Sequence, residues 1–430
     1  MSKFNHSVKV PTQYKVTAKI LRTALERQQS IKSLIFEEKH ARIGSLHAVL
    51  KHYSTNRGAI DNAIEETGLL KENPKLDPAL AKVLVSELIF GRGLLNGESR
   101  PVQTVRSYKE RLQQAISGTE LQKKEPNPRY VRINTNLFSI ADALEYLARN
   151  EWRRRELNAD ISYNDFLAAI RTLEEDEFTM DLHVEGVLIF HPKSSHYWAC
   201  HNLVVTKMFI LQNKATCLAA ELLAPPSGAT VLDMCAAPGM KTLHICNVMK
   251  NQGRIYAVEQ SRDRFNALCN ITELAGCQIV NPILADALTI GPEQCPDVEY
   301  VLVDPSCSGN GMQNRISVCD EVKDDKRLSK LAGLQIKILS HAMSAFPNVK
   351  RIVYCTCSLW KEENEQVVQR CLNLNPSFKL LNCKKALRNK WNNVGDKAYP
   401  KIGKNCLYCL PDQDLTDGIF LAMFEKISAD

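Results

Sequence analysis

The chain has 430 residues, of which 44% are hydrophobic and 24% charged, as in an ordinary globular protein with sizeable cores. Its 15 cysteines do not indicate a small disulfide-stapled fold, because the chain is too long and its first residues lack the apolar segment of a signal peptide. No apolar run reaches the roughly eighteen residues that a membrane span requires. We therefore expect a soluble intracellular protein.

The formal net charge of +7 is unevenly distributed. An excess of positive charge near the N-terminus is typical of a surface that meets a polyanion, although a solvated helix face would give the same pattern. Against the three acids Glu26, Glu37 and Glu38, this part of the sequence carries Lys9, Lys15, Lys19, Arg22, Arg27, Lys32, Lys39 and Arg42.

The pattern of apolar residues predicts three parts. Residues 1–125 are expected to be a helical domain, because apolar residues recur at helical spacing, and a polar segment with two prolines follows as a linker. Residues 126–203 are expected to be a small α+β segment, with a strand over 130–136 and a helix that Ser139 caps.

Residues 204–430 alternate between strands and helices. This order predicts an α/β fold with a doubly wound, mostly parallel sheet and right-handed crossovers. The last two expected strands are interpreted as an antiparallel edge. Seven strands are expected, at residues 230–235, 254–259, 278–284, 300–304, 351–354, 378–382 and 418–427.

The segment CAAPGMK, residues 235–241, follows the first of these strands. Its small residues allow a ligand to approach the backbone, and the helix behind it favours an anionic group. Glu259 ends the second strand and can accept hydrogens from ribose hydroxyls, while Asp286 can receive an adenine amine. The loop lacks G-x-G-x-x-G, so S-adenosylmethionine fits better than a dinucleotide. A tight turn with a surface glutamate is the alternative.

Two cysteines follow neighbouring expected strands, Cys307 in VLVDPSCSGNG and Cys357 in RIVYCTCSLW. Cytosine C5 is a poor nucleophile, and a thiolate that adds to C6 would activate it. Asp304 could offset charge at the ring, and Cys357 is expected to lie just before a helix, which favours a thiolate. The spacing leaves open which cysteine attacks. A small core residue is the alternative for any buried cysteine, and we assign Cys235, Cys355 and Cys371 to it.

Cys406 and Cys409 form a C-x-x-C pair, which is a spacing that zinc sites use. No second pair with ligand spacing accompanies them, so we predict no metal site.

From Arg129 to Glu425 five motifs occur in an order that resembles the Nop/Sun family of RNA cytosine-5 methyltransferases. They are PRYVRINTN, ILQNKATCLAAELLAPPSGATVLDMCAAPGMKT, DPSCSGNGM, YCTCSLWKEENEQVV and DGIFLAMFE. The Pro-Ser-Cys form, the first motif and the helical N-terminal region are most similar to the branch that acts on large-subunit ribosomal RNA, and within it to the metazoan nucleolar member.

The resemblance implies a Rossmann-like, S-adenosylmethionine-dependent methyltransferase domain, preceded by a helical domain and a small RNA-binding α+β segment. It implies that Cys357 attacks C6 and that Cys307 assists release, with Asp304 and Lys241 also in the catalytic site. It further implies an RNA partner, no membrane, no obligate protein partner and a nuclear, nucleolar location. The implied cofactor contacts are Cys235, Ala236, Ala237, Pro238, Gly239, Met240, Lys241, Glu259, Arg264, Asp286 and Asp304.

Two other functions were considered. A non-catalytic RNA-binding assembly factor would not need Cys307, Cys357, Asp304 and Lys241 together, so their presence argues against it. In DNA cytosine methyltransferases the cysteine of a Pro-Cys motif attacks, so the additional thiol of the Thr-Cys motif favours RNA as the substrate.

Overall fold

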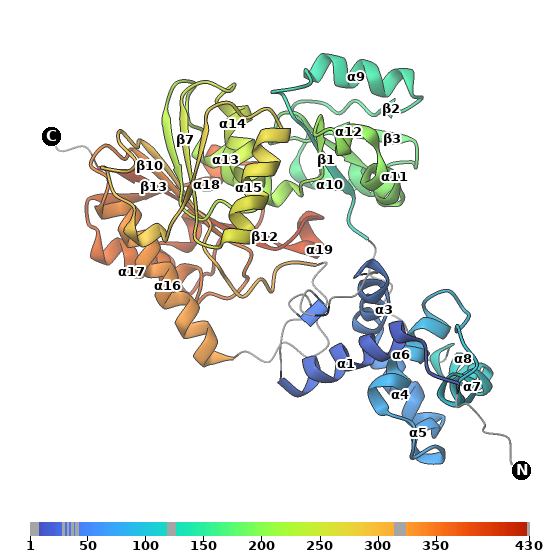
Figure 1. Cartoon of the computed structure of the whole chain (residues 1–430). Coiled ribbons are helices and arrows are strands. Elements are labelled where there is room, and N and C mark those ends of the chain that lie inside the picture. Colours follow the sequence, from blue (N-terminus) through green and yellow to red (C-terminus); the bar gives the residue numbers. More distant parts are fainter. Residues whose placement is uncertain are drawn as a thin grey trace, which may run out of the picture. The chain divides into compact units, whose positions relative to one another are not determined.

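The structure is a computed structural model that describes residues 8–27, 31, 34, 35, 38, 43–117, 126–313 and 324–427. The described residues form two compact units, one from the N-terminal part of the chain and one from residue 126 onward (Figure 1). Most of the expected linker at 123–128 lies outside the described residues. In the part that is described, no helix combines the length and apolar character of a membrane span.

The N-terminal unit is helical, as predicted. Helix α6 is its centre, since nine of its 12 residues are buried. The sequence defines its start, because Asp77 accepts a hydrogen bond from the Leu80 N–H at 2.8 Å and Pro78 follows directly. The helices are α1 (Thr12–Arg27), α3 (Ile43–Thr55), α4 (Arg57–Glu66), α5 (Leu69–Glu72), α6 (Pro78–Ile89), α7 (Arg100–Ser107) and α8 (Lys109–Ser117).

Part of the N-terminal positive charge is paired within this unit. Lys19 forms an ion pair with Glu38, and Arg22 lies 2.5 Å from Asp77. Both pairs are largely exposed, so they contribute little to stability. They do lower the positive charge that this region could offer to a polyanion. Of the other basic residues, Lys32, Lys39 and Arg42 lie outside the described residues.

The second unit begins with a small five-stranded sheet of order β2-β3-β4-β1-β5. Its strands are β1 (Arg129–Ile133), β2 (Arg153–Arg154), β3 (Glu177–Met180), β4 (Val187–Phe190) and β5 (Phe209–Ile210), and its helices are α9 (Ile140–Arg149), α10 (Tyr163–Arg171), α11 (Ser195–Cys200) and α12 (Asn202–Val205). Ser139 caps α9 by accepting the Asp142 N–H at 3.1 Å, as its position in the sequence predicts. Strand β5 lies beyond the boundary expected at residue 204.

Buried polar contacts join this sheet to the rest of the unit. Arg132 of β1 is 1% exposed and donates to Gln212 at 2.8 Å and to Asn247. Asn134 donates to the carbonyl of Ala275 at 2.9 Å. Because these donors would be costly to bury without partners, they orient the small sheet on the larger one.

The large sheet has the order β11-β13-β10-β9-β6-β7-β8, and β12 pairs with β13. The seven predicted strands form this path, and the three-residue strand β12 adds an eighth that was not predicted. Neighbours from β8 to β10 are parallel, while β13 is antiparallel to β10, β11 and β12. The strands are β6 (Thr230–Asp233), β7 (Arg254–Glu259), β8 (Val280–Leu284), β9 (Tyr300–Val303), β10 (Arg351–Thr356), β11 (Phe378–Leu381), β12 (Leu407–Cys409) and β13 (Ile419–Lys426).

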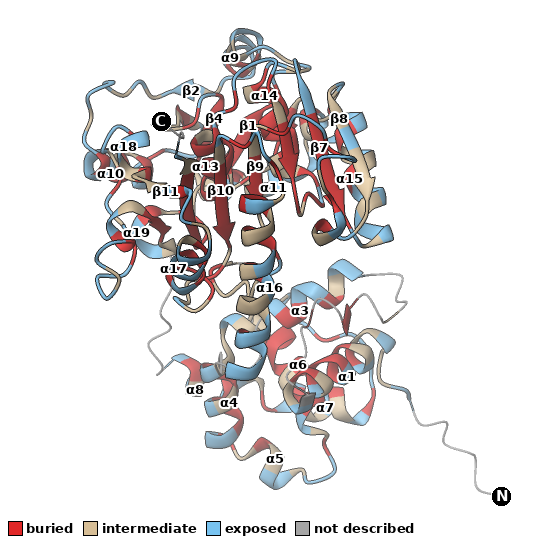
Figure 2. Ribbon diagram, turned by 90° about the vertical axis from the view of Figure 1, so that its left-hand side faces the viewer, coloured by how far each residue is buried: buried red, intermediate tan, exposed pale blue. Residues whose placement is uncertain are grey.

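Helices cover both faces of the large sheet, so its inner strands β6, β9 and β10 are largely buried, whereas β8 and β11 at the ends are partly exposed (Figure 2). Alternate residues of a strand face opposite layers: Val231 packs in the layer of α13 and α14, and Leu232 in the layer of α16 and α17. The helices of this part are α13 (Lys214–Leu223), α14 (Met240–Val248), α15 (Arg262–Leu274), α16 (Asp325–Ser344), α17 (Glu365–Leu374), α18 (Cys383–Ala386) and α19 (Pro411–Asp414).

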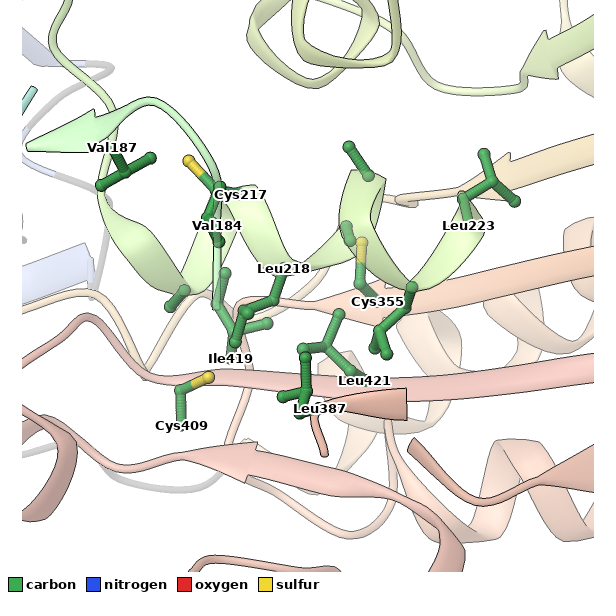
Figure 3. Packing of buried hydrophobic residues seen from close by; sticks show 14 of the residues in the cluster. Val184, Val187, Cys217, Leu218, Leu223, Cys355, Leu387, Cys409, Ile419 and Leu421 are labelled. Atoms are coloured by element: carbon green, nitrogen blue, oxygen red, sulfur yellow. The ribbon is translucent and has the colours of Figure 1, made fainter. Parts of the chain in front are cut away.

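Several cysteines are core residues. Cys217 of α13, Cys355 of β10 and Cys409 of β12 belong to one apolar cluster with Leu218 and Leu421 (Figure 3). Cys371 lies in the cluster on the opposite face, as does Cys406. Cys406 and Cys409 are therefore packed on different faces of the sheet. Among the described residues, no group of three or more histidine, cysteine or acidic side chains could hold a metal ion.

The strand order of this sheet reverses at β6. From β6 the chain moves outward through β7 and β8, whereas β9 and β10 lie on the other side of β6. In open α/β sheets, ligands bind at the carboxyl ends of the strands where the order reverses in this way. The loops that follow β6, β7, β9 and β10 therefore meet at the position expected for a site.

Candidate active site

The two cysteines of the sequence motifs meet at this edge. Cys307 follows β9 and Cys357 follows β10, and these strands are parallel neighbours. The two Sγ atoms lie 3.0 Å apart, a distance at which one thiol can donate a hydrogen bond to the other sulfur. Residues fifty positions apart in the sequence therefore come into contact.

Backbone contacts fix the two cysteine loops to each other. The Gly311 N–H donates to the Cys357 carbonyl at 3.0 Å, and Asn310 accepts the Leu359 N–H at 2.7 Å. Gly311 must be glycine here, because an added Cβ would lie 2.3 Å from the Gly418 carbonyl oxygen. These contacts limit how far the two sulfur atoms can separate.

An ion pair lies beside the thiols. Lys241 Nζ is 2.6 Å from Asp304 Oδ2, and the two side chains are only 15% and 28% exposed. Cys355 donates to the other oxygen of Asp304 at 3.4 Å. All four residues predicted to be catalytic, Lys241, Asp304, Cys307 and Cys357, thus come together in one site.

The site distinguishes the two thiols electrostatically. The hydrogen bond from Cys307 lowers the pKa of Cys357 below its ordinary value; Lys241 lowers it further, while burial and Asp304 oppose the shift. The same hydrogen bond and burial raise the pKa of Cys307 well above its ordinary value. Burial opposes the charge of Lys241, but the adjacent Asp304 raises the pKa of Lys241 above its ordinary value. Of the two thiols, Cys357 is therefore the one that favours the thiolate.

The helix expected directly after Cys357 begins later than predicted. Helix α17 starts at Glu365, and Asn364 closes a loop ahead of it. Asn364 accepts from Thr356 Oγ1 at 2.6 Å and donates to the Ser358 carbonyl at 2.9 Å, so side-chain bonds replace the first helical turn. The helix N-terminus is therefore not adjacent to Cys357, and the neighbouring Cys307 and Lys241 favour the thiolate instead.

Sequence reasoning missed the role of Glu363. This side chain is fully buried and accepts the Ser308 N–H at 2.9 Å, next to Cys307. Gln335 of α16 joins it by donating to Glu363 at 2.9 Å and to the Ser306 carbonyl at 3.0 Å. Glu363 and Gln335 therefore position the loop that carries Cys307. Glu363 lies in the polar run KEENE, where a glutamate is expected to be exposed to solvent. In the sequence, only the motif that surrounds it indicates a special position.

The loop of residues 235–241 connects β6 to α14. Gly239 has a φ of 108°, and an added Cβ would lie 2.6 Å from Ile271, so only glycine suits this position. Ala236 and Ala237 are buried against Leu268 of α15, Cys235 and Met240 are half-buried, and Pro238 is exposed. At the base of the loop Thr242 donates to Asp233 at 2.7 Å, and burial raises the pKa of Asp233 to about 7.

Glu259 and Arg264 lie next to this loop. Glu259 is 4% exposed at the end of β7; one oxygen accepts the Ser261 N–H at 2.8 Å, and the other lies 3.3 Å from Arg264. Arg264 also donates to the Ala237 carbonyl at 2.5 Å, so it joins the loop to Glu259. Each carboxylate oxygen of Glu259 keeps a second lone pair for ribose hydroxyl donors, which fits an adenosine ligand.

Asp286 is not joined by hydrogen bonds to the loop of residues 235–241 or to Glu259 and Arg264. It follows β8 and is exposed, and its carboxylate accepts the Leu288 N–H at 3.0 Å at the start of a short 3₁₀ turn. Within the described part of the chain, its hydrogen bonds do not reach the other predicted residues. The remaining lone pairs of the Asp286 carboxylate suit hydrogen bonds from an exocyclic amine at the exposed edge of the site.

Three family descriptions match consecutive parts of the chain. Residues 45–127 match the N-terminal domain of NOL1/NOP2/Sun domain family member 5, and residues 127–212 match the ferredoxin-like domain of the same protein. Residues 220–425 match the 16S rRNA methyltransferase RsmB/F family. The matches to member 5 cover the helical unit and the small sheet, where the catalytic motifs do not lie.

Curated relatives match over nearly the full length. The chain is 74% identical to a 28S rRNA (cytosine-C(5))-methyltransferase of Drosophila melanogaster, over 99% of this chain and 98% of the relative. It is 34% identical to a protein of the same description from Mus musculus, over 96% of this chain and 90% of the relative.

Solved structures share the fold. A methyltransferase homolog from Pyrococcus horikoshii superposes with a TM-score of 0.54 at 24% identity, over 82% of this chain and all of that chain. NSun6 from the same organism gives 0.53 at 18% identity, over 75% and 97% of the two chains. Because the chain matches the fly and mouse proteins over nearly its full length and carries two domains of member 5, it belongs to the member 5 branch of the NOL1/NOP2/Sun family of RNA cytosine-C5 methyltransferases.

Proposed function

We propose that this protein methylates C5 of a cytosine in large-subunit ribosomal RNA, with Cys357 as the nucleophile and Cys307 assisting release. The observation that carries the proposal is the pair of sulfur atoms 3.0 Å apart, with the ion pair of Lys241 and Asp304 beside them. The fly and mouse relatives, described as 28S rRNA methyltransferases, support the substrate. Transfer of a labelled methyl group to purified large-subunit rRNA, and not to small-subunit rRNA, is the test.

The proposed reaction begins with the Cys357 thiolate. A bond forms between its Sγ and C6 of the cytosine, and the ring electrons move toward C5, which becomes nucleophilic. S-adenosylmethionine, the methyl donor of the family, supplies an electrophilic methyl group when bound. The target base must leave any stack to reach the thiol, so an unpaired or flipped cytosine is required.

Asp304 and Lys241 support the attack. We assign Asp304 a contact to the cytosine ring, where charge accumulates once the thiolate has added. Lys241 holds Asp304 through the 2.6 Å ion pair and lowers the pKa of Cys357. Lys241 is thus a positioning residue as well as a source of positive charge close to the thiolate.

Release requires that a base, either the Cys307 sulfur as thiolate or a water molecule, take the proton from C5 and that the bond between C6 and Cys357 break. The electrons of the C5–H bond then restore the ring double bond, and those of the C6–S bond return to Cys357. Cys307 is within 3.0 Å of the sulfur that leaves, so it can assist this step. Its position, with Glu363 holding the adjacent Ser308 N–H, is set by the fold.

Glu259 is proposed to bind the ribose of the cofactor, with Asp286 at the adenine and residues 235–241 around the ligand. Glu259→Ala should weaken S-adenosylmethionine binding about ten- to hundredfold, because hydrogen bonds to a charged acceptor contribute about 1.5–3 kcal/mol each. Calorimetry measures this affinity directly. Glu259→Gln keeps one acceptor oxygen and should lose less. Unchanged affinity in a folded Glu259→Ala variant would rule out the ribose contact.

The coupling of the two thiols predicts a pH effect. In the wild type the Cys307 hydrogen bond is the main cause of the lowered pKa of Cys357. Cys307→Ala removes that donor, so the pKa of Cys357 rises and the thiolate forms only at higher pH. Single-turnover methyl transfer should therefore reach its plateau at a higher pH in Cys307→Ala than in the wild type. Superimposable pH profiles would mean that Cys307 does not tune Cys357.

The proposed substrate also indicates where in the cell the protein acts and in which form it meets the RNA. Large-subunit rRNA is assembled in the nucleolus, so we propose a nucleolar location and either free rRNA or a pre-ribosomal particle as the target. No obligate protein partner is part of the proposal.

A further inference from the structure

A charged segment leaves the edge of the large sheet between β11 and β12. Both strands pair with the same side of β13: Leu381 lies opposite Met423, and Leu407 opposite Leu421. The residues between them, 382–406, thus depart from one edge and return to it, and we refer to them as the edge loop. This segment was not identified in the sequence.

The edge loop is strongly basic. It carries seven basic residues and one acid, Asp396, a net charge of +6 against +7 for the whole chain. Apart from the half-buried Lys384 and Lys390, the basic side chains are exposed. The basic residues are Lys384, Lys385, Arg388, Lys390, Lys397, Lys401 and Lys404.

Almost all of this charge is unpaired. Lys390 donates to the carbonyl of Ala159 at 2.6 Å, but no carboxylate of the described residues forms an ion pair with a basic side chain of the edge loop. Elsewhere, Lys350 pairs with Glu299 and Lys379 lies 3.0 Å from Glu425. A dense set of unpaired cations repels itself, so its presence favours a polyanionic partner.

Hydrogen bonds connect the second half of the edge loop to the loop between β10 and α17, which carries Cys357. Gly395 and Gly403 close it, with a 2.9 Å bond from the Gly395 N–H to the Gly403 carbonyl. Glu365, the first residue of α17, accepts the Asp396 N–H at 2.7 Å and the Tyr408 hydroxyl at 2.9 Å. That hydroxyl in turn accepts from Asn364 at 3.0 Å.

Asn364 also accepts from Thr356, the residue before Cys357, at 2.6 Å. Lys397, Lys401 and Lys404 are therefore fixed to the same framework as the nucleophile.

The first half of the edge loop contacts the small sheet. Trp391 stacks on Tyr163 of α10 with ring centroids 4.8 Å apart, and Asn392 donates to Asn164 at 2.7 Å. The basic surface thus extends from the small sheet to the loop of Cys357.

We propose that the edge loop is a binding surface for the phosphate groups of RNA, which holds the substrate strand beside Cys357. The inference rests on the proposed function, because it names where the substrate of that reaction is held. Lysine, arginine and asparagine side chains are those that contact phosphates in protein–nucleic acid complexes.

An acidic protein is the competing partner. The cores of protein interfaces are rich in aromatic residues and poor in lysine. In the edge loop Leu387, Trp391 and Ile402 are buried, Tyr399 is half-buried and Val394 is 36% exposed. Most of the other exposed residues are lysine, arginine or asparagine, beside Asp396 and the small residues Ala386, Ala398 and Pro400. This composition favours RNA.

The test uses the full chain with Lys397→Gln, Lys401→Gln and Lys404→Gln combined. Anisotropy of a fluorescein-labelled single-stranded RNA, measured over a range of salt concentrations, reports affinity and the number of phosphate contacts. Each contact to single-stranded RNA contributes about 0.7 to the slope of log affinity against log salt, so the slope should fall by about 2. Affinity for S-adenosylmethionine and the unfolding temperature should not change.

Two controls accompany this variant. The corresponding lysine-to-arginine triple variant keeps the charge and should bind RNA as the wild type does. Lys326→Gln, Lys330→Gln and Lys337→Gln on α16 remove the same charge from exposed lysines that are also unpaired among the described residues. This second control should change the slope less.

A wild-type slope and affinity in the edge-loop variant would overturn the inference and favour an acidic protein as the partner. An equal loss in the α16 variant would also overturn it, since the effect would then reflect net charge alone. Because RNA binding is measured directly, the result does not depend on catalysis. A wild type that binds RNA through the edge loop but transfers no methyl group would contradict only the proposed function.

Discussion

Replacing Cys357 by alanine is expected to abolish methyl transfer to RNA, with a loss on the order of 10⁴-fold or more, the scale found when a nucleophile is removed. Without the thiolate no bond to C6 forms, and C5 stays too electron-poor to accept the methyl group. Cys307, whose pKa is raised by burial and by its bond to Cys357, is a poor substitute. Transfer of label from S-adenosylmethionine to large-subunit rRNA measures the loss.

Cys371→Ala is the matched control. This thiol is fully buried in the core between α17 and the sheet, whereas Cys357 is half-buried, and it has no part in the proposed site. It should keep activity close to that of the wild type, while Cys357→Ala should keep S-adenosylmethionine affinity. Substantial methyl transfer by Cys357→Ala would show that another group attacks the base.

The second large effect concerns stability. Asp181 and Lys214 form an ion pair at 2.6 Å with side chains 0% and 1% exposed. Lys214 Nζ also lies 4.9 Å from the centre of the Phe166 ring. Asp181→Ala would leave this ammonium buried without its counterion, which should lower the free energy of unfolding by about 3–5 kcal/mol. Urea unfolding of the full chain, followed by fluorescence and by circular dichroism, measures the loss.

The double variant Asp181→Leu with Lys214→Met is the control for this prediction. It removes both charges and fills the space with apolar atoms, so it should recover part of the lost stability. The recovery is incomplete because the other oxygen of Asp181 accepts the His183 and Val184 N–H groups, which lose this partner. A loss below about 1 kcal/mol in Asp181→Ala would mean that water or another group compensates the lysine.

Much of the second unit could be predicted because its signals are local. The strands that begin at Thr230 and Arg254 are short apolar runs. The Ser139 cap depends on a hydrogen bond to a residue only three positions along the chain. Strand β12 could not be predicted in this way, because it has three residues and follows the edge loop, which has no periodic pattern. Its pairing with β13 is defined only by tertiary contacts.

The residues of the candidate site also fall into two groups, those that local sequence signals predict and those that only tertiary contacts define. That Cys307, Cys357, Asp304 and Lys241 lie together could be predicted, because each follows a strand or opens a helix at the same edge of the sheet. Glu363 could not, since its partner, the Ser308 N–H, is 55 positions away and a buried glutamate in a polar run has no local signal. The lowered pKa of Cys357 likewise depends on the 3.0 Å contact with Cys307, which the sequence spacing does not define.

Denaturing electrophoresis of the enzyme after incubation with large-subunit rRNA and S-adenosylmethionine tests the roles of the two thiols most directly. We expect a retarded, RNA-linked band for Cys307→Ala, because attack and methylation proceed while release is slow. Cys357→Ala and the double variant should give no such band. A retarded band from Cys357→Ala and none from Cys307→Ala would assign the attack to Cys307 and contradict the proposed mechanism.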